Sequence, residues 1–214
     1  MPAVNTTITA TYKDAIVLRA PDNPANTVAG LDYGYYEGVW NLLPDFASLT
    51  PILTGTVDNF DISNAVVSDY FGYSFNGYID IPADGVYTFY TTSDDGSKLY
   101  ISNTEVVSND GLHPMVEKSG QIGLKAGKHA LKVVFFEKTG GAGLEVRYAG
   151  SNVSKQLIPN SKLYRIPPKY TLTVNNGTGD GNYVAGKAVA IQANAAPAGK
   201  AFDKWVVNAG NPSI

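Results

Sequence analysis

The chain has 214 residues, of which 44% are hydrophobic and 16% are charged, a composition typical of a folded globular protein. Its formal net charge is −3 and it contains no run of Lys or Arg, which argues against a nucleic-acid partner, because such partners are bound mainly by neutralising phosphates. Cysteine is absent, and no stretch approaches the roughly 20 apolar residues that span a bilayer, so we expect neither disulfides nor membrane insertion.

The first 29 residues carry little pattern. Met1 to Thr7 lacks the basic and apolar regions of a signal peptide, and one strand-like run follows at Thr7 to Tyr12. Pro and Asn are frequent after that run. Residues 1–29 are therefore either a linker with the tail of an upstream domain, or an extra edge strand of the domain that follows.

From residue 30 onward, short alternating segments separated by Gly, Asn, Asp and Pro predict antiparallel strands. The clearest strands are expected at Tyr70 to Ile81, Val86 to Thr92, His129 to Phe136 and Gly143 to Tyr148. No long segment has the period of a helix, although Leu43 to Leu49 can hold a short helical turn. Many short strands with frequent turns favour an all-β sandwich or closed barrel.

Three local features carry further expectations. Lys125 to Lys128 is expected to be a hairpin turn leading into the strand that begins at His129. His129 is expected to be an ordinary, partly exposed residue. The aromatic cluster Tyr33, Tyr35, Tyr36 and Trp40 is assigned to packing, because aromatic side chains in sandwiches mostly fill cores or cover edges.

A domain boundary is expected at Tyr164 to Lys169, where Pro167 and Pro168 form a short stiff linker. Beyond it, strands are expected at Tyr170 to Val174 and at Lys187 to Ala193, and the segment Gly199 to Trp205 is expected to lead into a third. Three strands make a poor independent core. Residues 169–214 are therefore expected to be an incomplete β module within a longer protein.

The sharpest local feature is the segment Ser93-Asp94-Asp95-Gly96-Ser97 at the end of a predicted strand. Two adjacent carboxylates repel one another, so their place in one tight turn calls for a counter-charge or for good solvation. Calcium is a suitable counter-charge, because it binds six to eight oxygen ligands and tolerates irregular geometry. The alternative is a simple turn in which an Asp accepts hydrogen bonds from nearby backbone N–H groups.

Residues 30–165 resemble the protective-antigen-fourteen (PA-fourteen) domain family, which occurs in an anthrax toxin component, in bacterial glycosidases and in yeast flocculins. The order and spacing of seven segments carry the resemblance: Gly30 to Gly38, Phe75 to Ile79, Gly85 to Phe89, Ser93 to Ile101, Asn109 to His113, Leu124 to Gly127 and Gly140 to Leu144. The resemblance implies an antiparallel β-sandwich whose loops form a recognition surface.

In the sugar-binding adhesins of that family, the paired Asp residues bind calcium through a cis peptide bond, and hydroxyls of the sugar complete the coordination. The resemblance thus implies that Asp94 and Asp95 bind Ca²⁺ and, through it, a carbohydrate. A second loop of the adhesins contributes an Asn side chain and backbone carbonyls. Here that loop is Lys138 to Gly143, which lacks Asn, so Gly140, Gly141 and Ala142 would contribute through their backbone.

Asp110 and His113 are weaker candidates for the same site. Asp110 can approach the metal and His113 can line the site, but Asn-Asp-Gly is also a common turn and His113 can be a hydrogen-bonded scaffold residue. Catalysis is not expected. Asp94 and Asp95 are sequence neighbours, poorly placed to flank a glycosidic bond from opposite faces as a glycoside hydrolase requires.

Residues from Lys169 onward resemble internalin B-repeat-like modules, which occur in strings on secreted bacterial proteins. The complete expectation is a monomeric, non-catalytic carbohydrate-binding module that uses Ca²⁺ and targets a secreted or cell-surface bacterial glycosidase or adhesin to a glycan or polysaccharide. The alternative is a structural spacer domain without a ligand in a multidomain surface protein.

Overall fold

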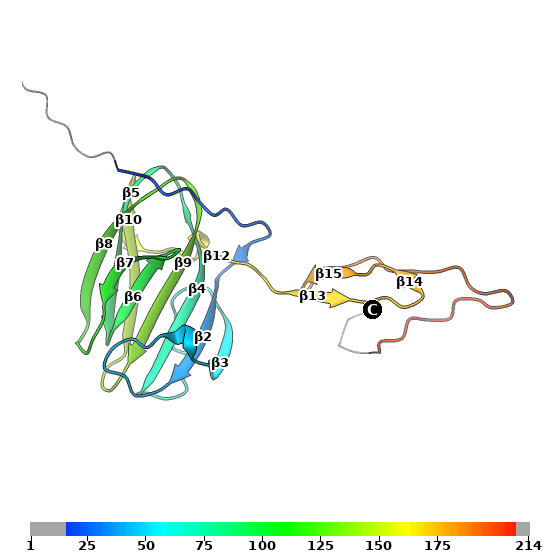
Figure 1. The fold of residues 1–214 in the computed structure, drawn as a ribbon, viewed down its shortest axis with the longest axis horizontal. Coiled ribbons are helices and arrows are strands. Elements are labelled where there is room, and N and C mark those ends of the chain that lie inside the picture. The colour runs from blue at the N-terminus through cyan, green and yellow to red at the C-terminus, as the bar shows by residue number, and fades with distance from the viewer. Residues whose placement is uncertain (1–15, 209–214) are drawn as a thin grey trace, which may run out of the picture. The chain divides into compact units, whose positions relative to one another are not determined.

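The computed structural model describes residues 16–208, so the strand expected at Thr7 to Tyr12 lies outside the described residues. The chain divides into two compact units, Met1–Ile166 and Pro167–Ile214. Figure 1 shows the first unit as a set of long, paired strands. Each unit is described by itself.

The larger sheet of the first unit contains eight antiparallel strands in the order β1-β12-β4-β9-β6-β7, with β2 paired to β4 and β3 paired to β2. Their bounds are β1 (Val28–Ala29), β2 (Leu31–Glu37), β3 (Leu53–Val57), β4 (Phe71–Ile81), β6 (Ser97–Ile101), β7 (Thr104–Asn109), β9 (Gly127–Glu137) and β12 (Leu163–Arg165). The ladder between β4 and β9 lies at the centre of this sheet and extends from Phe71↔Glu137 to Ile81↔Gly127.

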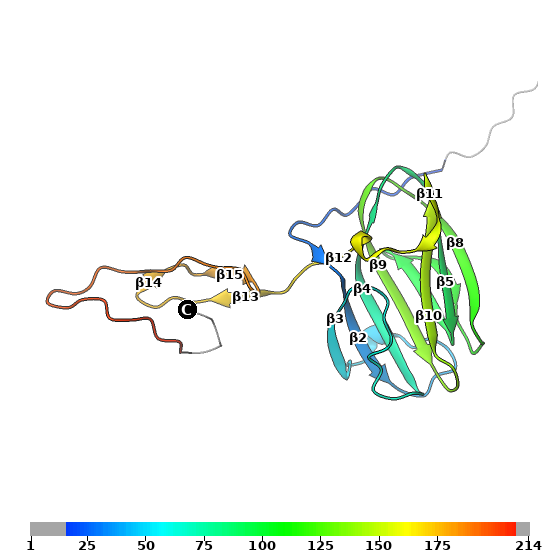
Figure 2. The ribbon, with the colours of Figure 1, turned by 180° about the vertical axis from the view of Figure 1, so that it is seen from behind.

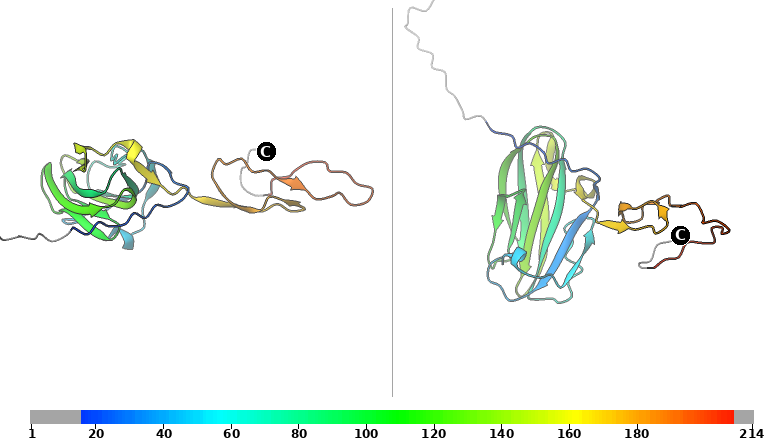
Figure 3. Two further views of the ribbon diagram at one scale, coloured as in Figure 1. Left: turned by 90° about the horizontal axis from the view of Figure 1, so that it is seen from above. Right: turned by 45° about the vertical axis from the view of Figure 1, so that its right-hand side comes forward.

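The smaller sheet contains four antiparallel strands in the order β11-β10-β5-β8, and Figure 2 shows it from its own side. Their bounds are β5 (Gly85–Asp94), β8 (Val116–Leu124), β10 (Gly143–Gly150) and β11 (Val153–Leu157). The described helices of this unit are two short 3-10 turns, Phe46–Ser48 and Asn160–Lys162. The two sheets face one another (Figure 3), which confirms the predicted all-β antiparallel sandwich. The 3-10 turn Phe46–Ser48 confirms the helical turn expected within Leu43 to Leu49.

The core lies between the two sheets and follows the period of two that the sequence shows. Leu131, Val133 and Phe135 of β9 are buried against Tyr87 and Phe89 of β5 and other members of one apolar cluster. Burying each such side chain stabilises the fold by about 1.5–3 kcal/mol. Gly120 allows β8 to lie close to β7 of the larger sheet, because a Cβ atom on Gly120 would lie 1.6 Å from the carbonyl oxygen of Val106.

A second, smaller apolar cluster covers part of the outer face of the larger sheet. Tyr36, Phe46 and Val134 form it, and Trp40 packs against them with its ring 5.8 Å from that of Phe46. Tyr35 is fully buried in the main core. The prediction that this aromatic group serves packing is therefore confirmed.

The turn after β8 differs from the expectation. Lys125 to Lys128 joins β8 of the smaller sheet to β9 of the larger sheet, so it crosses between the layers and is not a hairpin. Alternation within one strand shows which side chains face inward, but it does not show which strand is the partner. The expected hairpin turn is wrong for this reason.

Residues 16–29 lie against the sandwich. The backbone N–H of Arg19 donates to the carbonyl of Gly123 (2.9 Å), and Lys125 donates to the carbonyl of Arg19 (3.0 Å). At the other end of the segment, β1 pairs with β12 in the larger sheet. Although the sequence places a boundary at residue 30, Val28 and Ala29 already belong to the sheet, because their backbone groups pair with Tyr164 and Arg165.

The side chain of Arg19 fastens this segment to His129. One guanidinium nitrogen lies 2.8 Å from Nδ1 of His129, and the other donates to Asp22 at 2.7 Å. Nε2 of His129 lies 2.7 Å from the carbonyl oxygen of Lys125, so the neutral ring donates there and accepts from Arg19. His129 is fully buried, which contradicts the expected partial exposure. His129 lies on the same face of β9 as Leu131, two residues further on, and the N-terminal segment covers it.

We expect residues 19–23 to detach from the sandwich as the pH falls below the ordinary His pKa near 6.5. Desolvation lowers the pKa of His129, and the Arg19 charge lowers it further, while the Asp22 carboxylate opposes the shift. The neutral ring therefore stabilises the docked segment above the ordinary His pKa near 6.5, and this stabilisation is lost as the pH falls, when Nδ1 becomes a donor facing Arg19.

An NMR pH titration of the backbone amides of residues 19–23 tests this expectation. The signals should move together with those of His129, with a midpoint below 6.5. His129→Gln keeps a neutral acceptor for Arg19 and should stay docked at pH 5. Signals that do not change between pH 7 and pH 5 in the unsubstituted protein would contradict the expectation.

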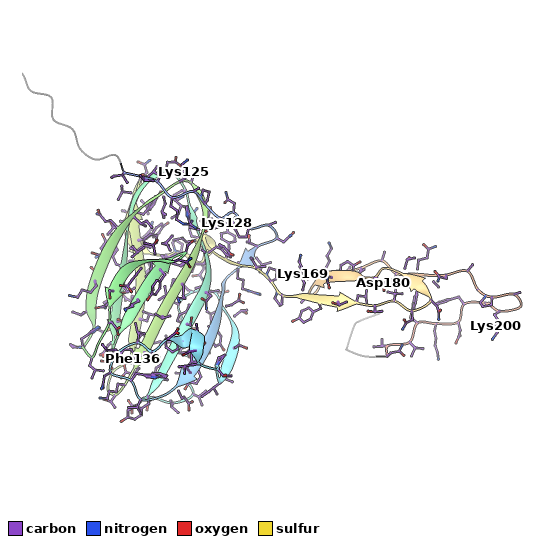
Figure 4. The ribbon with its side chains drawn as sticks, viewed as in Figure 1. Lys125, Lys128, Phe136, Lys169, Asp180 and Lys200 are labelled. Carbon is purple, nitrogen blue, oxygen red and sulfur yellow. The ribbon has the colours of Figure 1, made fainter. Side chains whose placement is uncertain are left out.

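The second unit holds two small antiparallel sheets, one pairing β13 with β15 and the other β14 with β16. Their bounds are β13 (Lys169–Leu172), β14 (Gly177–Thr178), β15 (Gly181–Val184) and β16 (Gln192–Ala193). The strand expected at Lys187 to Ala193 is reduced to its last two residues, because β13 takes its partner from the Gly-rich segment after Asp180 instead. Figure 4 labels Lys169 and Asp180 within this unit.

The third expected strand of this unit is not present between Ala201 and Asn208, the last residue that the structure describes. Phe202 and Trp205 instead pack against each other, with ring centroids 5.6 Å apart. Among residues 16–208, no helix has the length and hydropathy needed to cross a membrane.

Candidate metal and ligand site

Asp94 and Asp95 lie where the chain passes from the smaller sheet to the larger one. β5 ends at Asp94 beside β10, and β6 begins at Ser97 beside β9. Between them, Gly96 is required by close packing, because a Cβ atom there would lie 2.5 Å from the Phe136 ring. Both ends of the turn are thus fixed by strands that belong to different sheets. Figure 4 labels Phe136 near one end of the sandwich and Lys125 and Lys128 near the other.

Hydrogen bonds between buried hydroxyl and amide groups connect the two ends of this turn. Oγ of Ser93 lies 2.7 Å from Oγ of Ser97, and Nδ2 of Asn109 donates to Ser93 (3.1 Å) and to the carbonyl of Val116 (2.9 Å). All three polar side chains are buried. Asn109 therefore links the Asp turn to β7 and β8, a role that the sequence does not reveal.

Asp95 is held rigidly by the loops around it. The Asp94–Asp95 peptide bond is cis, as the resemblance predicts. Oδ1 of Asp95 accepts from the backbone N–H of His113 (3.0 Å), and Oδ2 accepts from the backbone N–H of Lys138 (3.0 Å). The Asp95 N–H donates to Oε2 of Glu137 at 3.1 Å. One carboxylate thus ties together the Asp turn, the β7–β8 loop and the β9–β10 loop.

Glu137 is a third carboxylate of this site. Asp94, Asp95 and Glu137 each offer a carboxylate oxygen, and these oxygens lie within 4.8 Å of one another. Glu137 is fully buried, and its Oε1 has no hydrogen-bond partner. The sequence analysis missed Glu137. A signal was present, because it continues the inward-facing series Leu131, Val133 and Phe135 at the end of β9.

Burial and neighbouring carboxylates raise the pKa of Glu137 and of Asp94. Burial raises the pKa of Glu137 to about 7, with further upward contributions from Asp95 and Asp94, and the Asp95 N–H opposes the shift. Burial and then the Asp95 charge also raise the pKa of Asp94, while the nearby His113 lowers it. Such shifts are typical of carboxylates that are buried beside other negative charges.

The loop Lys138 to Gly143 lies beside the cluster, as predicted. A Cβ atom on Gly141 would lie 3.5 Å from Oδ2 of Asp94, and Gly143 pairs with Asp94 across β10 and β5. Gly140 has a φ of +111°, a conformation that favours glycine, and its N–H donates to Oδ1 of Asp69 at 3.1 Å. Ala142 lies between Gly141 and Gly143 in the same loop.

The two weaker candidates have structural contacts instead. Oδ1 of Asp110 accepts from the backbone N–H groups of Leu43 (2.8 Å) and Gly111 (2.9 Å), and Oδ2 lies 3.5 Å from Nζ of Lys98. The His113 ring lies against the carbonyls of Asn109 and Pro114. The structure does not bring Asp110 into the three-carboxylate group, and His113 contacts that group through its backbone N–H.

The donor set of the cluster fits a hard divalent cation. All of its ligand atoms are oxygens, and Ca²⁺ binds six to eight oxygens from carboxylates, backbone carbonyls, hydroxyls and water. A buried carboxylate oxygen without a partner is costly, and a bound cation would compensate it. Asp94 and Glu137 can each offer an oxygen, and Asp95 retains lone pairs beyond its two backbone contacts.

The PA14 domain family matches this chain over residues 28–162. The chain therefore belongs to the PA14 domain family, which confirms the family expected for its larger domain.

Several relatives are similar to this chain. The anti-sigma-I factor RsgI3 of Acetivibrio thermocellus is 25% identical over 139 residues, which are 64% of this chain and 22% of the relative. A solved anti-sigma factor domain-containing protein has a TM-score of 0.57 and 23% identity, over 64% of this chain and 48% of the other. A PA14 sugar-binding domain from an RTX adhesin has a TM-score of 0.55 and 16% identity, over 64% and 99%. The chain thus spans less than half of the first two relatives, and the adhesin domain shows the shared fold.

Proposed function

We propose that residues 28–165 form a non-catalytic, calcium-assisted carbohydrate-binding module. The observation that carries the proposal is the buried Oε1 of Glu137, which lacks a partner and lies in a group with the carboxylates of Asp94 and Asp95. A buried, unpaired carboxylate oxygen beside two further carboxylates is suited to a cation. The sugar-binding PA14 domain with the same fold supports a glycan as the ligand of that cation.

Each carboxylate has a distinct part in the proposed site. Glu137 and Asp95 would hold the ion from the buried side, where their positions are fixed by β9 and by two backbone N–H groups. Asp94 is only partly buried and lies beside Gly141, so it would hold the ion from the side that solvent reaches. Vicinal sugar hydroxyls would then replace water in the remaining coordination positions.

The loop Lys138 to Gly143 would complete the recognition surface. It carries no Asn, but Glu137 directly precedes it and supplies an oxygen in its place. In this proposal, backbone groups of Gly140, Gly141 and Ala142 contact the sugar. We propose that the module works as a monomer and directs a secreted or cell-surface bacterial protein to a glycan.

The alternative remains a spacer domain that binds no ligand. We propose the spacer role for residues 169–214, whose described part, up to Asn208, forms two short two-stranded sheets. The anti-sigma relatives indicate that domains of this family occur in parent proteins other than adhesins and glycosidases. The binding module proposed here is compatible with any parent that presents it to a glycan.

Calorimetric titration with Ca²⁺, followed by a glycan array in Ca²⁺ or in EDTA, tests the proposal. We expect one Ca²⁺ site, weaker binding of Mg²⁺ and glycan retention that EDTA abolishes. Mg²⁺ is the matched control because it demands a near-ideal octahedral shell and gives up water reluctantly. Absence of both calcium binding and glycan retention would favour the spacer.

A further inference from the structure

The charge around the cluster has a consequence for the kind of sugar that the module accepts. Asp69 lies next to the three carboxylates, because its Oδ1 accepts from Gly140 and its charge adds to the rise in the pKa of Glu137. Asp69 is thus a fourth carboxylate beside the group formed by Asp94, Asp95 and Glu137.

Basic side chains do little to neutralise this group. Among residues 16–208, none of the ion pairs between a basic group and a carboxylate involves any of these four carboxylates. Lys138 is adjacent in sequence, but its Nζ donates to Oδ1 of Asn41 at 2.8 Å. Lys98 lies between Glu105 and Asp110, so its charge is already shared by two other acids.

A single bound divalent cation therefore leaves the site negative. Four carboxylates carry more charge than one Ca²⁺ and one lysine can balance. Exposed apolar side chains also lie beside the site. Met115 is about half exposed and lies beside Gly143, which pairs with Asp94, because a Cβ atom on Gly143 would lie 2.6 Å from the Met115 sulfur. Tyr70, whose backbone N–H donates to the carbonyl of Lys138, and Leu42, next to Leu43, are also exposed.

We propose that this module selects neutral sugars over uronic acids and other anionic sugars. The inference rests on the proposed calcium-assisted function and specifies its ligand class. A neutral pyranose offers a diol to the ion and an apolar ring face to side chains such as Met115. A uronate adds a negative charge to a site that already has an excess of it after one Ca²⁺ and Lys138 are counted against the four carboxylates.

The test uses an array of matched pairs on one linker, each a neutral hexose and its uronic acid, with homogalacturonan in methyl-esterified and de-esterified forms. In saturating Ca²⁺ and about 20 mM NaCl, the neutral member should bind about tenfold more tightly, and the ratio should shrink in about 0.5 M NaCl, where exposed charges are screened beyond about 4 Å. A steric preference would not depend on salt.

Asp69→Asn is the informative variant, because Asn keeps an oxygen for the Gly140 N–H and removes one charge. It should reduce the neutral-to-acidic ratio several-fold while calcium still binds. Asp84→Asn is the matched control, since Oδ1 of Asp84 likewise accepts a backbone N–H, that of Ala126 at 2.8 Å, near Lys125 at the opposite end of the sandwich. It should leave the ratio unchanged.

The outcomes separate the two proposals. Equal or tighter binding of the uronic members would overturn the charge selection and leave the calcium-assisted function standing. A salt-independent ratio, or a ratio that Asp69→Asn leaves unchanged, would also overturn it. Absence of any calcium-dependent retention across all pairs would instead refute the proposed function on which the selection rests.

Discussion

Replacing Asp94 with Asn is expected to weaken calcium binding at least about tenfold, a loss of about 1.4 kcal/mol in binding free energy, and to remove calcium-dependent glycan retention. The reason is that the variant removes one of three charged ligands from a site where ligand charge sets the affinity. The fold should be kept, because Asp94 is only partly buried and its backbone stays in the ladder between β5 and β10.

Asp95 is a less informative target than Asp94. Both of its carboxylate oxygens accept backbone N–H groups from two different loops, so Asn at this position would turn an amide donor towards a backbone donor. Asp95→Asn would therefore lower both calcium affinity and stability. Asp94→Asn separates the loss of calcium affinity from the loss of stability, because the Asp94 side chain does not accept backbone N–H groups from those two loops.

Calorimetry and thermal unfolding with and without Ca²⁺ measure the effect at Asp94. Calcium at 100 times its dissociation constant should stabilise the unsubstituted protein by about 2.7 kcal/mol, and most of this gain should be lost in Asp94→Asn. The control is again Asp84→Asn, which should keep the full gain. An unchanged calcium affinity in Asp94→Asn would show that the ion does not bind at this cluster.

The second large effect concerns the metal-free protein, which should lose stability as the pH rises from about 5 to about 7. The pKa of Glu137 is raised from an ordinary value near 4.5 to about 7 in the folded state. Between these values the folded state holds a proton that the unfolded chain has released, so raising the pH favours unfolding. One pKa unit corresponds to about 1.4 kcal/mol, which gives a loss of about 2–3 kcal/mol.

Chemical denaturation in EDTA at several pH values measures this dependence. Glu137→Gln should flatten the profile, because glutamine keeps the shape and an acceptor for the Asp95 N–H without a titrating group. The exposed Glu117→Gln on β8 should leave the slope as it was. A metal-free protein that is equally stable at pH 5 and pH 7 would contradict the assigned environment of Glu137.

Local patterns in the sequence were sufficient for the strands and for part of the site. Alternation along β4, β5, β9 and β10 marks which side chains face inward, because successive residues of a strand point to opposite faces of the sheet. The Asp-Asp-Gly segment between two strands marks the turn that carries Asp94 and Asp95. The order and spacing of this segment and six others indicate the PA14 domain family, which the match over residues 28–162 confirms.

The tertiary structure alone decided how these strands pair and what surrounds the two Asp residues. The turn at Lys125 to Lys128 joins different sheets, because pairing depends on long-range contacts that alternation within a strand does not encode. His129 is buried because Arg19, 110 residues earlier in the chain, covers it. Glu137 is 42 residues from Asp95 and becomes its neighbour only because β6 and β9 lie side by side. The sequence shows that residue 137 is a glutamate, but its burial and the missing hydrogen-bond partner of its Oε1 result from the packing of strands that are distant in the sequence.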